Sequence, residues 1–144
     1  MKNYYALITS DSAEVKAYEI FQNRIKENRF PLYLKTPYLE TIKKNDEVLF
    51  YIAGRNMHSQ SFVAKSRVKE VEVLKDLYVD ADNTKRIVNR YLLFENIIVL
   101  EKPKLIKPII ERLDFIRVKQ NFGTYLVGGV VKLNDKDFNT ILNS

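Results

Sequence analysis

The residue types that most often carry catalysis are scarce in this chain. It has no cysteine, and its single histidine, His58, stands beside Ser59 and Ser61 in a stretch that we predict to be a polar hairpin loop. A serine–histidine nucleophile needs a base that is held in place and shielded from water, which neighbours in a surface loop do not provide. We therefore expect His58 to be an exposed loop residue, and we expect that the protein is not an enzyme.

Metal chemistry has little support either. Asp80 and Asp82 lie on one side if their segment is extended, but such acids usually cap a helix or face solvent. The glycine and distal glutamate of a calcium loop are missing around them. Without cysteine, and with one histidine, thiolate zinc sites and histidine pairs are excluded. We predict neither a metal nor a cofactor.

Aromatic residues with basic neighbours are more informative. Three such pairs stand in or beside expected loops, and they are Arg29 with Phe30, Tyr33 with Lys35, and Lys119 with Phe122. An aromatic ring can stack on an extruded base while a nearby cation contacts its phosphate. The alternative is that these rings fill the ends of the sheet.

Positive charge favours the same class of partner. The chain has 24 basic against 18 acidic residues, a formal net charge of +6. Between residues 102 and 119, Glu111 and Asp114 are outnumbered by six cations, which are Lys102, Lys104, Lys107, Arg112, Arg117 and Lys119. Clustered cations are what a phosphate footprint requires, although a solvated surface has the same composition.

The elements that position these residues fit one domain over residues 1–144. The chain is 46% hydrophobic, which suffices for a core, and it shows no repeat or linker. It has no signal-peptide pattern and no run of about 20 apolar residues. We expect a soluble cytoplasmic protein with no membrane partner.

Hydrophobic spacing and turn residues give a sequence of elements. In the first half we predict a strand over 4–9, a helix over 12–28, an extended loop over 29–33, a short helix over 36–43 and a strand over 47–53. In the second half we predict a long strand over 61–73, strand structure over 91–105, a short helix over 107–113, two short strands within 122–133 and a last helix over 134–142. Segment 74–89 fits a loop or a short helix equally well.

These elements favour an α+β fold. The apolar parity of the long strand changes between Val68 and Val71, which indicates a bulge or bend of the kind that curves a sheet. Strands outnumber helices and no regular β-α-β alternation appears, so we expect a curved or closed mixed sheet. Neither common glycine-rich phosphate loop is present.

Four strings in this order resemble a known family. They are YYALIT at 4–9, IKKNDEVLFY at 42–51, LDFIRVK at 113–119 and NDKDF at 134–138. Together they resemble the EVE domain of the PUA-like superfamily, which is related to YTH domains, in its short stand-alone prokaryotic form. Asn45 stands where the family has glycine, and Phe30 and Phe122 stand where relatives often carry tryptophan.

The resemblance implies a PUA-like pseudo-barrel with flanking helices that binds a modified or flipped base of DNA or RNA. It places Thr9 and Ser10 at the base edges, with Phe30, Tyr33 and Phe122 as stacking residues in the same cleft. The residues expected to contact phosphate are Arg29, Lys35, Arg117 and Lys119. Such a site needs no cofactor or metal.

Two other functions stay open at this point. One is a metal-independent ribonuclease similar to the related ASCH group, acting through Lys and Tyr side chains. The other is a protein-interaction domain, which should expose an apolar patch. The sequence does not choose between DNA and RNA, nor does it give the oligomeric state.

Overall fold

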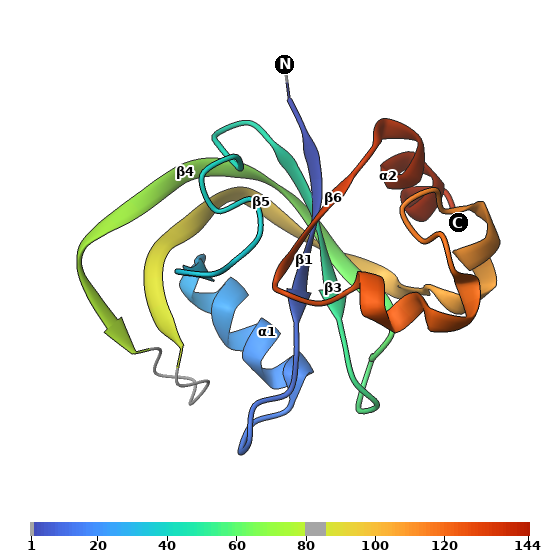
Figure 1. Ribbon diagram of the computed structural model, residues 1–144, viewed down its shortest axis with the longest axis horizontal. Helices are drawn as coiled ribbons and strands as arrows, with labels where there is room; N and C mark the ends of the chain where they lie inside the picture. Colours follow the sequence, from blue (N-terminus) through green and yellow to red (C-terminus); the bar gives the residue numbers. More distant parts are fainter. Residues whose placement is uncertain (1, 80–85) are drawn as a thin grey trace.

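A computed structural model describes residues 2–79 and 86–144, so the candidate carboxylates Asp80 and Asp82 lie outside the described residues (Figure 1). The strands are β1 (Tyr4–Thr9), β2 (Phe30–Tyr33), β3 (Glu47–Ile52), β4 (Ser61–Val79), β5 (Ile87–Leu105) and β6 (Val130–Leu133). The helices are α1 (Ala17–Glu27) and α2 (Asp135–Leu142), with 3-10 helices η1 (Lys107–Arg112) and η2 (Lys119–Tyr125). Neither α-helix has the length and apolar character needed to cross a membrane.

Within the described residues, the six strands form one mixed sheet in the order β2-β5-β4-β3-β1-β6. β1 runs parallel to β3, and the other neighbouring strands are antiparallel. The long β4–β5 pair shifts register at four places, one of them between Val68 and Glu70, where the sequence predicts a bulge. Bulges bend and twist a strand pair, so the sheet curls into a half-barrel (Figure 1).

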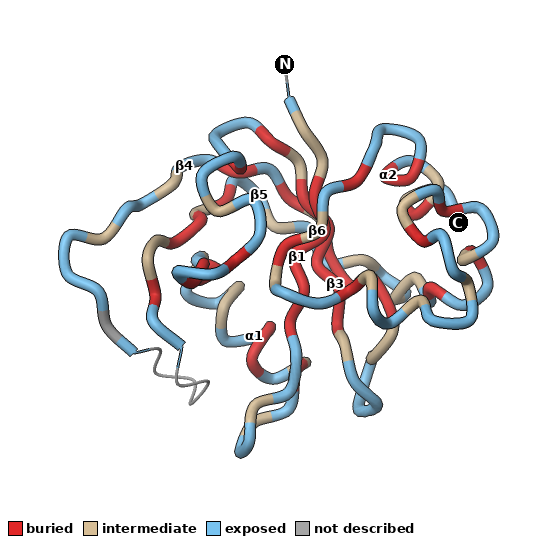
Figure 2. The backbone as a smooth tube through the Cα atoms, in the orientation of Figure 1, coloured by how far each residue is buried: buried red, intermediate tan, exposed pale blue. Residues whose placement is uncertain are grey.

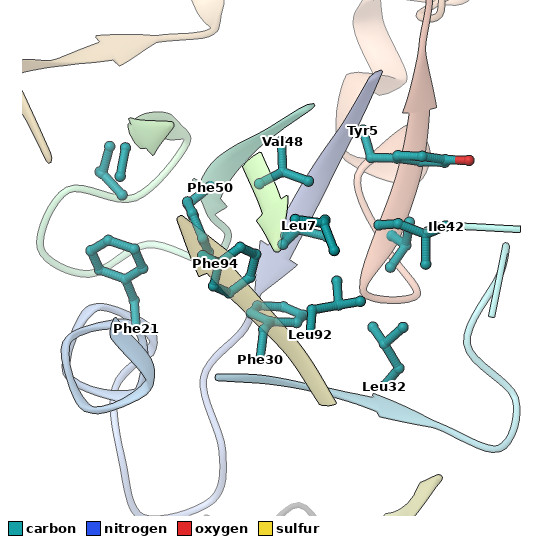
Figure 3. Packing of buried hydrophobic residues seen from close by; sticks show 14 of the residues in the cluster. Tyr5, Leu7, Phe21, Phe30, Leu32, Ile42, Val48, Phe50, Leu92 and Phe94 are labelled. Atoms are coloured by element: carbon teal, nitrogen blue, oxygen red, sulfur yellow. The ribbon is translucent and has the colours of Figure 1, made fainter. Parts of the chain in front are cut away.

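The two faces of the sheet carry separate cores. Along β3, Val48 and Phe50 belong to one cluster while Leu49 and Tyr51 belong to the other, as period-two alternation requires. The first cluster packs against α1 and includes Phe30 (Figure 3). The second packs against η1, η2 and α2. Figure 2 shows this burial along the central strands.

Several predicted elements are wrong in detail. The first helix begins at Ala17, because Ser12–Val15 forms a turn and the Asp11 carboxylate accepts from the Ala17 N–H at 2.7 Å. Segment 36–43 forms turns, since Tyr38 adopts a φ of +61°, which a helix excludes.

The second half also differs from the prediction. Within 74–89, the described residues 74–79 and 87–89 are strand, because β4 continues to Val79 and β5 starts at Ile87. Within 122–133, the 3-10 helix η2 takes the place of the first predicted short strand, and the second is confirmed as β6. The strand over 4–9 and the last helix are confirmed, and in that helix the Asn134 side chain accepts from the Asp137 N–H.

Candidate nucleic-acid interface

Two adjoining cavities open where β1 ends and β2 turns away from the sheet. The larger, which we call the outer cavity, has a volume of about 410 Å³, within the range of small-ligand sites. Its lining comes from the turn after β2, the start of β5 and the loop before β6, and consists of Tyr33, Leu34, Lys35, Thr36, Arg86, Ile87 and Gly128. Side chains far apart in the sequence therefore share one hollow.

The smaller one, which we call the inner cavity, continues from the outer cavity and shares four of its lining residues, which are Tyr33, Thr36, Arg86 and Gly128. It adds Ser10, Asp11, Arg24 and Phe30 to the site. Its volume of about 50 Å³ suits a water molecule or two, and a nucleobase does not fit. A planar ligand would occupy the outer cavity and direct its polar edge towards the inner one.

Arg24 on α1 ties the elements of the site together. Its guanidinium donates to Thr9 Oγ1 at 3.4 Å and to the Tyr33 hydroxyl at 3.2 Å. It also lies 4.6 Å from the centre of the Phe30 ring, in cation–π contact. The end of β1, the helix and β2 are thereby held in one arrangement around the inner cavity.

The outer wall is built by turns with specific backbone geometry. The Thr36 N–H donates to the Tyr33 carbonyl at 3.0 Å, and the Tyr33 N–H donates to Thr36 Oγ1 at 2.8 Å. Gly128 and Gly129 both have positive φ, and the Gly129 carbonyl accepts from the Ile8 N–H at 2.7 Å. The loop before β6 is thereby fixed beside the turn after β2.

The electrostatics of the site favour an anion. Among the described residues, Arg24, Lys35 and Arg86 line the two cavities together with one carboxylate, that of Asp11. This carboxylate is already hydrogen-bonded to the Ala17 N–H and, at 2.8 Å, to the Asn56 side chain. The Arg86 guanidinium lies 5.3 Å from the centre of the Tyr33 ring and is itself exposed, so its plane is accessible to an aromatic ligand.

Of the residues predicted to touch a base, three line the cavities, and they are Ser10, Phe30 and Tyr33. Thr9 does not line a cavity, but its hydroxyl accepts a hydrogen bond from Arg24, which does. Phe30, however, is only 2% exposed and lies between Arg24 and the Phe50 ring. Its ring is core, which corrects the expectation that it presents a stacking surface. Tyr33, at 9% exposure, lines both cavities.

Phe122 does not join this cleft, and that geometric expectation is wrong. It lies on η2 and packs against the second core cluster, on the opposite face of the sheet from Phe30. The reason is that the segment from η1 to η2 docks beside α2, so the sheet separates Phe122 from the cavities.

The predicted phosphate contacts are also scattered. Lys35 lines the outer cavity. Arg29 is engaged elsewhere, since its guanidinium lies 4.3 Å from the Tyr91 ring centre and forms an ion pair with Glu27. Burial raises the pKa of Tyr91, and the positive charge of Arg29 opposes this shift. The remaining two lie with η1, η2 and α2 on the other face of the sheet, a part that we call the η1–η2 lobe. There Arg117 is exposed, while Lys119 donates to the carbonyls of Leu113 and Ile116.

Sequence reasoning missed Arg24, Arg86 and Thr36. Arg24 gave no signal, because a cation on a helix is ordinarily solvated and its partners come from distant strands. Arg86 falls in the stretch that the sequence left as loop or helix. The Gly128-Gly129 pair is an ordinary turn signal, but its place beside Thr36 depends on how the sheet curls.

The curved mixed sheet with flanking helices is a PUA-like fold, and solved structures with this fold superpose on nearly the whole chain. Human THYN1 in complex with 5-methylcytosine-containing DNA matches with a TM-score of 0.55 at 14% identity, over 99% of this chain and 96% of that one. The N-terminal domain of Thermococcus gammatolerans McrB bound to m5C DNA matches with a TM-score of 0.54 at 14% identity, over 99% of this chain and 96% of that one. The N-terminal domain of Staphylothermus marinus McrB matches with a TM-score of 0.54 at 11% identity, over 99% of this chain and 94% of that one.

Identities this low establish the shared fold and nothing more about this chain. No protein-family model matches the sequence, and no curated protein matches it.

Proposed function

We propose that the protein is a non-enzymatic nucleic-acid-binding module of the EVE type that reads a modified or flipped base. The base occupies the outer cavity beside Tyr33, the Arg86 guanidinium stacks on it, and Lys35 contacts the neighbouring phosphate. Ser10 and the Arg24-held Thr9 lie behind it, where the polar edge of a base would point.

The observation that carries this proposal is the outer cavity itself. Its volume of about 410 Å³ accommodates a small planar ligand, and an aromatic ring and two cations line it. Aromatic and guanidinium planes stack on bases of any sequence, while Lys and Arg neutralise phosphate.

The first ligand to test is 5-methylcytosine in duplex DNA. Two solved structures with this fold, human THYN1 and the Thermococcus gammatolerans McrB domain, are complexes with DNA that contains this base. The same DNA is therefore the most direct probe for the cavity of this chain.

The experiment is an equilibrium titration of labelled duplexes that differ only in one cytosine or 5-methylcytosine, with RNA of the same sequence alongside. Wild-type protein should bind the modified duplex more tightly than the unmodified one. Arg86→Ala should reduce affinity by about 5- to 150-fold, the equivalent of 1–3 kcal/mol for one stacking contact. Arg86 is exposed, so the variant should remain folded.

The matched control is Arg117→Ala, which removes an exposed arginine from the other lobe. It should leave the affinity and the preference for the modified base unchanged. Equal wild-type affinity for all probes would contradict base reading. Cleavage of the RNA by pure protein without metal would favour the ribonuclease alternative instead.

A further inference from the structure

A second hollow, separate from the cavities, lies between the turn before β3 and the β4–β5 pair. Figure 1 shows this turquoise segment beside the long strands, and the Asn45 N–H donates to the Val68 carbonyl at 2.8 Å. The hollow has a volume of about 660 Å³ and is lined by Ile42, Lys43, Lys44, Lys69, Glu70, Val71, Val73 and Arg90. We call these eight residues the basic groove.

The charge of the groove is largely unneutralised. It holds four cations and one carboxylate, that of Glu70. Within the described part of the chain, Lys44, Lys69 and Arg90 form no ion pair, and Arg90 donates to the neutral Asn89 side chain at 2.7 Å. Like charges brought together without counter-charges create a site that attracts an anion.

The groove is also held rigidly. Asp46 is fully buried, and its carboxylate accepts from the Asn3 and Lys43 N–H groups, each at 2.9 Å. The Val68 N–H donates to the Asp46 carbonyl at 2.9 Å. The turn that carries Lys43 and Lys44 is thereby fixed to β4, which carries Lys69, before any ligand arrives.

β5 connects the groove with the cavity. Arg86 lines the cavity and Arg90 lines the groove. Four residues of extended strand span about 13 Å, which corresponds to roughly four nucleotides along one strand of duplex DNA. A single backbone can therefore pass both places.

We propose that the basic groove binds the phosphate backbone of the nucleic acid whose base enters the cavity. The inference rests on the proposed function for its ligand, and it assigns sequence-independent affinity to Lys44, Lys69 and Arg90. Apolar Ile42, Val71 and Val73 form the rest of the wall and suit the sugar face of the backbone.

The test is the salt dependence of binding to the unmodified duplex and to RNA of the same sequence. In Lys44→Ala/Lys69→Ala, the slope of log affinity for the DNA duplex against log salt should fall by about 1.8, because each phosphate contact on B-DNA contributes about 0.9. Between 50 and 200 mM salt the wild-type protein should then lose about twelvefold more affinity than the variant. Both lysines are exposed, so the fold should persist.

Two further variants make the result specific. Lys44→Arg/Lys69→Arg keeps both charges and should restore the wild-type slope. Lys26→Ala/Lys132→Ala removes two exposed lysines that line neither hollow, and it should leave the slope unchanged. An unchanged slope in the Lys44/Lys69 variant, or an equal drop in the Lys26/Lys132 variant, would overturn the groove.

The outcomes separate the two proposals. A lower slope in the Lys44/Lys69 variant, with no wild-type preference for any modified base, would support the groove and contradict base reading. A retained preference with an unchanged slope would do the reverse. Wild-type protein that binds neither DNA nor RNA would contradict both.

Discussion

Replacing Gly128 by alanine tests how the wall of the cavity is built. Gly128 has a φ of +84°, and a Cβ added there would lie 3.2 and 3.3 Å from the Cγ and Cδ atoms of Pro37. A positive φ costs an L-residue roughly 1–2 kcal/mol, and the close carbon contacts oppose relaxation. We expect Gly128→Ala to lower the free energy of unfolding by about 1–3 kcal/mol.

The assay is urea unfolding followed by circular dichroism, with Gly123→Ala as the matched control. Gly123 has no positive φ, and a Cβ there would meet no atom within 4 Å. Its replacement should be neutral or stabilise by up to about 1 kcal/mol, through the entropy of the unfolded chain. Gly128→Ala should also weaken nucleic-acid binding, because the loop before β6 must move away from Pro37.

Equal stability of the two alanine variants would refute this reasoning. It would mean that the loop before β6 accommodates a side chain, so the close approach to Pro37 does not define the cavity wall. Lower stability with unchanged binding would leave the packing argument intact and remove the loop from the binding site.

Two more predictions concern the cores. The buried Asp137 carboxylate accepts from the Asp114 and Phe115 N–H groups at 2.8 and 2.9 Å. Asp137→Ala should therefore lower the free energy of unfolding, measured in urea, by about 2–4 kcal/mol, and a loss below about 0.5 kcal/mol would contradict this. Burial raises the pKa of Tyr5 to about 12, so the stabilisation of its neutral phenol is complete below pH 10 and disappears as the pH rises through 12. Within the part of the chain that the structure describes, its hydroxyl has no hydrogen-bond partner, and Tyr5→Phe should therefore be neutral or stabilising at pH 7. The substitution should also flatten the loss of melting temperature between pH 9 and 12, and an unchanged alkaline loss would contradict this.

The fold was predictable where local patterns and tertiary packing agree. Val48 and Phe50 alternate with Leu49 and Tyr51 along one strand, and this period of two assigns them to the two faces of the sheet. The parity change after Val68 marks a real bulge. Asn134 caps the last helix as its residue type suggests.

The site was less predictable, because its composition depends on which face of the sheet each loop meets. Phe30 and Phe122 have the same local signature, an aromatic beside a cation. Phe30 nevertheless packs in the cluster beneath α1, while Phe122, on η2, packs against the cluster on the other face of the sheet. Tyr38 excludes the helix predicted over 36–43 through a backbone conformation that its residue type does not favour. Arg24 becomes a site residue only after β1 and β2 converge on it.

The most direct test of base reading is a crystal structure of the protein with a duplex that contains one 5-methylcytosine. We expect the modified base to be extruded from the helix and to lie in the outer cavity beside Tyr33, stacked on the exposed side of the Arg86 guanidinium. A base that stays stacked in the duplex, or a nucleic acid bound on the η1–η2 lobe with the outer cavity unvisited, would contradict it.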